Sequence, residues 1–248
     1  MRSGFQRAIR GVTLVLAVPG AALAGPPLSI DDPGILDPGK YEFILASSME
    51  KRASGNAYFF PVIDVSYGIS TNVQVAAVAT RAINRPEEGS RKSDFGPGAL
   101  GIKWRFLNQG DLQMSVAPYF ESVLRNGAVD RGVVDDTEAW VLPVELQYQF
   151  ADWRLNTEVR YAAARDTGDE WSYGIAGAVP LADRIEALVE FHGGADRTLD
   201  DKGLLYRLGL DLAVRDDLHV LVAAGSSFHE PGDDDLDFQA YLGLQWFP

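Results

Sequence analysis

Charged side chains that recur at every second position of otherwise apolar segments are the residues with the clearest chemical potential. Glu158 and Arg160 occupy one such segment, and Glu186 and Glu190 occupy another. Side chains two residues apart on a strand share a face, and rings of charged side chains select ions or polar solutes in pores. Opposite charges could also pair and hold a narrow polar core closed. Under either interpretation the candidate lumen-lining residues are Lys103, Arg105, Glu121, Glu145, Glu158, Arg160, Glu186, Glu190, Arg207 and Asp211.

Several of these charges are close enough in the expected strand order to neighbour each other across strands. The register cannot be read from the sequence, so the pairs are expectations. They are Arg105 with Glu121, Glu145 with Arg160, Glu190 with Arg207, and Asp211 with an adjacent base.

Catalytic chemistry has little support in the residue inventory. The chain has three His and no Cys, which excludes disulfides, thiolate metal sites and Cys nucleophiles. A Ser nucleophile needs its base within hydrogen-bond reach, yet His229 is near Ser226 and Ser227 only in sequence, and no Ser is close to His192. No phosphate loop, His-pair metal motif or EF-hand loop is present. We expect no catalytic residues, no metal and no cofactor, and a barrel-type lipid hydrolase is the least favoured function.

The first 24 residues have the pattern of an export signal. Arg2, Arg7 and Arg10 precede an apolar run over residues 11–23, and Ala22-Leu23-Ala24 gives a small-x-small cleavage pattern. The run is shorter than the roughly 20 apolar residues of a transmembrane helix. The formal net charge of the chain is −13, which disfavours nucleic-acid binding because that requires clustered Lys and Arg.

The remaining sequence has the rhythm of an all-β protein. Segments of about ten residues alternate apolar with polar or small side chains, and Gly, Asn, Asp, Ser or Pro clusters separate them. Helical spacing is not sustained anywhere after residue 24. Twelve strands are predicted over residues 40–50, 57–68, 73–82, 99–107, 112–124, 138–150, 153–164, 171–180, 184–193, 203–214, 218–228 and 237–247.

The connections between these strands alternate in length. Those after even-numbered strands are tight, as at Ala182-Asp183 and Asp216-Asp217. Those after odd-numbered strands are mostly longer and more charged, as over residues 84–98, 125–137 and 194–202. Outer-membrane barrels have short periplasmic turns and longer external loops on an even number of antiparallel strands. The asymmetry therefore favours a membrane barrel with both termini in the periplasm.

The distribution of charge between the two faces of each strand agrees with a barrel. If the more apolar face looks outward, Arg81 is the only charge on that face across the twelve strands, as lipid exposure demands. A soluble sandwich would show the same alternation with the apolar face turned inward. Aromatic residues near both predicted rims, including Trp104, Trp140 and Trp246, favour the membrane interpretation.

Three motifs in the N-terminal third resemble a family of outer-membrane barrels named for the meta-pathway of phenol degradation. They are Asp31-Asp32-Pro33-Gly34 with Pro38-Gly39 and Glu42, then residues 67–72 (YGISTN), and residues 96–106 (GPGALGIKWRF). Ala99 departs from the family pattern, in which an Asp often follows the second glycine. The resemblance implies a transporter-like barrel that passes small, hydrophobic or aromatic compounds, and it implies no catalytic residues.

Residues 25–39, between the signal peptide and the first strand, are rich in Pro and Gly. We expect them to form a periplasmic segment that leads into the barrel over residues 40–248. The alternative is a plug that folds into the lumen, where Asp31 and Asp32 would meet Lys103, Arg105 or Arg207.

The sequence thus predicts an up-and-down antiparallel barrel of about twelve strands in the cell outer membrane, acting as a passive channel or transporter for small molecules. A non-conducting structural or envelope-integrity barrel is the alternative. The expected partners are outer-membrane lipid, lipopolysaccharide, the barrel assembly machinery and an unidentified small solute.

Overall fold

The computed structural model describes residues 25–124, 126–136, 138–165, 168–196, 202–229 and 236–248, and the expected signal peptide lies outside these ranges. The described residues form thirteen strands and one short helix. Their bounds are β1 Tyr41–Arg52, β2 Gly55–Ser70, β3 Val73–Pro86, β4 Lys92–Gln109, β5 Leu112–Val116, β6 Tyr119–Val123, α1 Asn126–Asp130, β7 Glu138–Gln149, β8 Arg154–Ala164, β9 Glu170–Ala182, β10 Ile185–Asp196, β11 Lys202–Arg215, β12 Leu218–His229 and β13 Leu236–Trp246.

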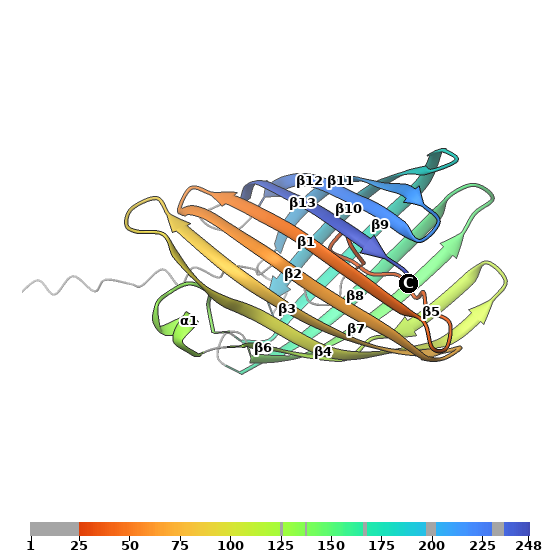
Figure 1. The fold of residues 1–248 in the computed structure, drawn as a ribbon, viewed down its shortest axis with the longest axis horizontal. Coiled ribbons are helices and arrows are strands. Elements are labelled where there is room, and N and C mark those ends of the chain that lie inside the picture. The colour runs from red at the N-terminus through yellow and green to blue at the C-terminus, as the bar shows by residue number, and fades with distance from the viewer. Residues whose placement is uncertain (1–24, 125, 137, 166–167, 197–201, 230–235) are drawn as a thin grey trace, which may run out of the picture.

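The strands close into a single antiparallel barrel (Figure 1). The first strand, β1, pairs with the last, β13, and β5 and β6 lie in one row between β4 and β7. This row is interrupted at Ala117 and Pro118 because proline has no N–H to donate to the ladder. The thirteen segments therefore make twelve rows, and the predicted all-β barrel of about twelve strands is confirmed.

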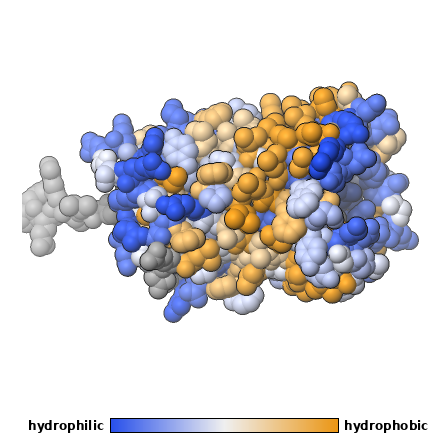
Figure 2. Space-filling view, viewed as in Figure 1, coloured by the Kyte–Doolittle hydropathy of each residue, from blue (hydrophilic) through white to orange (hydrophobic). Residues whose placement is uncertain are grey.

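The alternation of side chains settles which face is turned outward. Leu208 and Leu100 are 60% and 68% exposed, whereas Glu145 and Glu190 are fully buried inside the barrel. Figure 2 shows the apolar side chains gathered over the middle of the molecule, with hydrophilic side chains toward both ends. A soluble sandwich would bury the apolar set and expose the charges. The outer surface instead has the apolar band of a barrel in lipid.

Aromatic side chains lie toward both ends of this band. At the end with tight turns, the rings of Phe150 and Trp153 are stacked with centroids 3.9 Å apart. At the end with longer loops, Phe228 contacts Phe191 and Tyr206. These two ends are called the turn end and the loop end below, and in membrane barrels the turn end faces the periplasm.

Strands β3 and β4 extend well into the region predicted as a loop. Asn84 pairs with Lys92, so most of residues 84–98 are in the sheet. Gly96, Pro97 and Gly98, residue types that usually interrupt strands, lie within β4. Here a register shift between Ala79 and Arg81 accommodates Pro97, and the Thr80 hydroxyl donates to its carbonyl oxygen at 2.6 Å. Prolines within sheets are commonly found at such irregularities.

The connection between β6 and β7 contains α1, and it covers the lumen at the loop end. Ala128, Val133 and Val134 are buried in one cluster with the apolar lumen patch, the inner side chains Ile44, Ala46, Phe59, Val62, Val78 and Ala82 of β1, β2 and β3. The sequence predicts a charged external loop over residues 125–137. Its described part packs onto the wall because the inner face is apolar there. Within the described ranges, no helix is long and apolar enough to cross a membrane.

Candidate functional site: the lumen and the segment inside it

Residues 25–36, here called the lumen segment, lie inside the barrel. The wall makes room for them at β9, whose inner face carries the small residues Ser172, Gly174, Ala176 and Ala178 along its middle. A Cβ atom added at Gly174 would collide with the Ile30 side chain. The absence of a side chain at this position therefore allows the segment to approach the wall closely.

The chain enters the lumen from the turn end of the barrel. The N–H of Gly39 donates to the carbonyl oxygen of Gly68 at 2.8 Å, and the N–H of Gly68 donates to that of Lys40 at 3.0 Å. A Cβ atom at Gly68 would collide with the carbonyl oxygens of Leu36 and Asp37. Gly68 therefore provides the backbone approach at which the chain passes from the lumen into β1.

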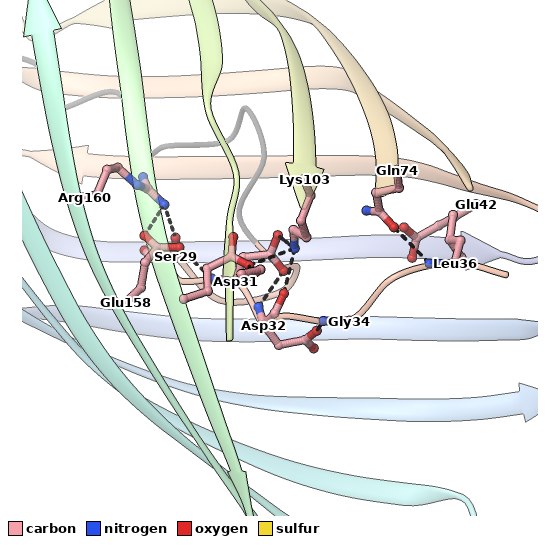
Figure 3. A network of polar contacts seen from close by, with 12 residues as sticks. Ser29, Asp31, Asp32, Gly34, Leu36, Glu42, Gln74, Lys103, Glu158 and Arg160 are labelled. Carbon is pink, nitrogen blue, oxygen red and sulfur yellow. Dashed lines mark hydrogen bonds and ion pairs between the residues drawn. The ribbon is translucent and has the colours of Figure 1, made fainter. Parts of the chain in front are cut away.

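Carboxylates of the wall hold the backbone of the lumen segment. The N–H groups of Ser29 and Ile30 donate to Glu190 Oε1 at 2.7 and 2.8 Å, and the Asp31 N–H donates to Glu158 Oε2 at 3.1 Å. Arg160 donates to the Ser29 carbonyl oxygen at 3.2 Å, and this contact is seen beside Glu158 in Figure 3. Hydrogen bonds that involve charged groups are about twice as strong as neutral ones, so this is a firm anchorage.

Lys103 is the central tether. Its ammonium lies 2.5 Å from Asp31 Oδ2, 2.6 Å from the Asp32 carbonyl oxygen and 3.3 Å from Glu145 Oε2 (Figure 3). The Ser115 hydroxyl donates to Glu145 at 2.5 Å. Burial raises the pKa of Asp31, and the Lys103 charge opposes that shift. A buried ammonium shared by two carboxylates satisfies groups that would be costly to leave unpaired.

These contacts correct the expected periplasmic position of residues 25–39. Residues 25–36 are in the lumen, as the plug alternative described, and residues 37–39 lie at the rim. Of the three bases named for the plug, Lys103 makes the contact. Arg207 donates to Gln239 Oε1 at 2.5 Å instead. The composition of the segment could not reveal this, because the small face of β9 is visible only once the strands are placed.

All ten candidate lumen-lining residues are on the inner face of the barrel. Six of them are buried, namely Lys103, Glu121, Glu145, Glu158, Arg160 and Glu190. The others are half-buried, namely Arg105, Glu186, Arg207 and Asp211. Arg154 forms a two-pronged ion pair with Glu186, with N–O distances of 2.6 and 2.5 Å.

Two of the predicted cross-strand pairs are present. Glu190 and Arg207 are directly opposite in the β10–β11 register, with Arg207 Nε 3.9 Å from Glu190 Oε2. The partner of Asp211 is His219, whose Nδ1 lies 2.7 Å from Asp211 Oδ1. His219 is on the neighbouring strand β12, so the expected adjacent base is an imidazole.

The predicted pair of Glu145 and Arg160 is wrong because of the register. Glu145 is opposite Glu158, and Arg160 is opposite Pro143. Arg160 instead pairs with Glu158 on its own strand, at 2.6 Å. Glu145 instead pairs with Lys103 on β4, on the other side of the intervening β5 strand.

The predicted pair of Arg105 and Glu121 is wrong for a similar reason. Glu121 pairs with Ala99 in the β4–β6 register, toward the loop end, whereas Arg105 lies near the turn end. Arg105 donates to Gln113 Oε1 at 3.3 Å and to the Thr71 carbonyl oxygen at 3.0 Å.

Between the lumen segment and the turn end lies a polar cavity of about 340 Å³, here called the vestibule. Its wall carries more acidic than basic side chains. Lys103 and Arg154 are the bases, and the acids are Asp31, Asp32, Glu42, Asp64, Glu186 and Asp211. A vestibule of this composition can hold water and small polar solutes, and its charge favours cations.

The candidate lumen-lining residues are all charged, so they do not include the amide side chains that also face the lumen. Gln74 accepts a hydrogen bond from the Leu36 N–H at 3.0 Å, Gln239 accepts one from Arg207, and Gln245 donates to Glu42. All three are on inner faces, so the same two-residue alternation would have found them had uncharged polar residues been included.

Solved structures with this fold are outer-membrane porins and channels. The COG4313 outer membrane channel from Pseudomonas putida F1 aligns with a TM-score of 0.70 and 8% sequence identity, over 88% of this chain and 98% of that one. The NanC porin aligns with a TM-score of 0.61 and 8% identity, over 83% and 99%. The KdgM porin aligns with a TM-score of 0.57 and 7% identity, over 82% and 98%.

At these identities the likeness establishes the fold. The chain shares the β-barrel fold of these proteins. No family model matches the sequence, and no curated protein matches it.

Proposed function

We propose that the protein is a passive outer-membrane channel for small molecules, and that the lumen segment narrows its passage. The observation that carries this proposal is the vestibule, a polar cavity inside a closed barrel that is lined by charged and amide side chains. A solute entering from the turn end meets the lumen segment, which is held mainly by polar contacts. The named functions of the KdgM, NanC and COG4313 proteins support a channel.

The same proposal includes membership of the meta-pathway phenol degradation family. The three motifs behind that resemblance meet in the lumen and at its turn-end rim, where Gly39 of the first motif donates to Gly68 of the second. Asp31 and Asp32 of the first motif contact Lys103 of the third, and Gly68 of the second lies against Leu36 and Asp37. A shared anchorage of the lumen segment explains why these particular residues would occur together. The family implies small hydrophobic or aromatic solutes.

A non-conducting structural barrel is the second candidate, and one observation favours it. Both the lumen segment and the β6–β7 connection occupy the interior, the first by polar contacts and the second through the apolar lumen patch. A barrel filled from both ends could serve envelope integrity alone.

The proposal also excludes catalysis. His192 is buried on the inner face of β10, where its Nε2 atom has no hydrogen-bond partner. The hydroxyls of Ser226 and Ser227 donate to the Leu236 carbonyl oxygen. In the described part of the chain neither serine is paired with a histidine base.

Planar-bilayer conductance of the protein with and without residues 25–36 tests the proposal. We expect small channels from the intact protein and a severalfold larger conductance after the deletion. Asp237→Asn, at the loop-end rim, is the control and should match the intact protein. If neither form conducts, and neither admits sugars, amino acids or simple aromatics into liposomes, the structural alternative replaces the channel.

A further inference from the structure

A second, smaller cavity lies between the lumen segment and the wall formed by β1, β2, β12 and β13. Its volume is about 50 Å³, and about 10–15 Å³ is enough for one water molecule, so a small organic molecule fits. Most of its lining is apolar, including Leu28, Ile44, Val62, Ala223 and Tyr241. We call it the inner pocket. It shares Asp64 with the vestibule, so the two cavities adjoin.

Three polar atoms of the inner pocket have no hydrogen-bond partner. They are Asp64 Oδ1 on β2, Gln239 Nε2 on β13 and Ser48 Oγ on β1. Asp64 and Gln239 are only 8% and 5% exposed. Buried polar atoms are nearly always paired, and leaving one unpaired is costly. Three such atoms from three strands around one cavity therefore indicate a ligand.

The hydrogen-bonding capacity of two of these groups is fixed by their surroundings. Arg207 can only donate, so the Gln239 oxygen faces it and the Gln239 Nε2 group remains as a free donor. Asp64 is an acceptor, and the basic side chains nearest to it contact other groups. Lys103 is bound to Asp31 and Glu145. Arg207 also lines the inner pocket, but it donates to Gln239 and lies beside Glu190. Glu42, on the neighbouring strand, adds negative charge next to Asp64.

We propose that the inner pocket binds a small amphipathic cation that carries a hydrogen-bond acceptor, as a short amino alcohol does. Its ammonium group donates to Asp64, its hydroxyl oxygen accepts from Gln239, and its methylene groups contact Ile44, Val62 and Tyr241. The Ser48 hydroxyl can accept from the ammonium group, and it can donate to or accept from the ligand hydroxyl. This site rests on the proposed channel function and narrows it, because a molecule bound here lies beside the lumen segment.

Binding of three matched probes to the full mature chain in detergent micelles tests the site. The probes are 3-amino-1-propanol, 1,3-propanediol, which lacks the charge, and n-butylammonium, which lacks the acceptor. In saturation-transfer NMR, 3-amino-1-propanol should bind with the highest affinity, n-butylammonium with a lower affinity and 1,3-propanediol with the lowest. Asp64→Asn should weaken 3-amino-1-propanol at least about tenfold, since it removes a charge-assisted hydrogen bond. Asp237→Asn, which makes the same change at the exposed Lys51 pair, should leave the affinity unchanged.

A second variant keeps the test decisive if Asp64→Asn does not fold. Ala223→Leu fills the inner pocket without altering any charge, and it should abolish binding. Equal binding of 1,3-propanediol, no binding to the intact protein, or unchanged binding to either variant overturns the site. Conductance of the same preparations separates the two proposals. A conducting protein that ignores the probes retains the channel function, and a non-conducting protein that binds them retains only the pocket.

Discussion

Two regions of the chain occupy the lumen, and they are held there by opposite kinds of interaction. The lumen segment, residues 25–36, is anchored by Lys103, Glu158, Glu190 and Arg160 through hydrogen bonds and ion pairs. The described part of the β6–β7 connection instead buries Ala128, Val133 and Val134 against the apolar lumen patch. The wall thus contains a polar docking surface on β4, β8 and β10 and an apolar one on β1, β2 and β3.

The difference teaches which barrier a solute could displace. Polar contacts can be exchanged for contacts with water or a charged solute, and this exchange offsets part of the free energy lost when they break. Apolar contacts are lost only by exposing their surface to water, at about 25 cal/mol per Å². The lumen segment is therefore the barrier that responds to solute, and the β6–β7 connection is the more permanent cover. Four substitutions distinguish them.

The largest effect is expected from Gly174→Leu. The new side chain collides with Ile30 and expels the lumen segment without changing any charge. Single-channel conductance should rise to that of the protein lacking residues 25–36. Gly177→Leu is the matched control, since it adds the same side chain to the outer face of the same strand. Unchanged conductance in Gly174→Leu would mean that the segment does not obstruct the passage.

Val133→Asp should release the other region. A carboxylate placed among buried apolar side chains costs several kcal/mol, so the β6–β7 connection should detach from the apolar lumen patch. Trypsin cleavage after Arg131 should become at least tenfold faster. Val133→Ala keeps the site apolar and should have a much smaller effect. Conductance should change less than in Gly174→Leu, and an equal change would remove the distinction between the two regions.

Lys103→Met should loosen the lumen segment without expelling it. The substitution leaves Asp31 and Glu145 without their cation, and breaking a buried ion pair costs about 3–5 kcal/mol. Hydrogen exchange of the amides of residues 29–31 should become faster, because their protection depends on the docked segment. Arg105→Met, on the same strand, should leave that exchange unchanged.

Arg131→Ala should have the smallest effect. Arg131 pairs with Asp94, whose side chain is only 6% exposed, but the Arg131 side chain is 54% exposed, so water screens its charge and weakens the pair. Trypsin can no longer cut at this position, so hydrogen exchange of residues 128–134 is the measurement. Marked deprotection there would show that charge, rather than the buried valines, holds the connection.

The sequence was sufficient for the architecture because strand alternation depends on local patterns. Outward Leu208 and inward Arg207 are adjacent residues, and lipid requires that difference at every strand. The alternation of side chains does not predict where a strand continues through an irregularity. Pro97 lies in the loop predicted over residues 84–98. Its place within β4 depends on Thr80 of the neighbouring strand, whose hydroxyl donates to the Pro97 carbonyl oxygen.

The interior was predicted less well because it depends on register and on chain segments distant in sequence. Glu145 was assigned to Arg160, but a pairing that places Glu158 opposite Glu145 turned it toward Lys103. The sequence predicts a periplasmic position for the lumen segment because a high Pro and Gly content is typical of any exposed segment that precedes a strand. Its position depends on the vacant space at Gly174, more than a hundred residues away.

The pairing of β1 with β13 has a consequence for how the protein is assembled. The lumen segment precedes β1 in the chain, so it is attached to one edge of the seam, and β13 forms the other edge. The barrel must therefore close around the lumen segment, which is already connected to β1. Loss of β13 would give an open trough with two unpaired edges, and its hydrogen-bonding groups would be exposed to lipid, where none can be tolerated.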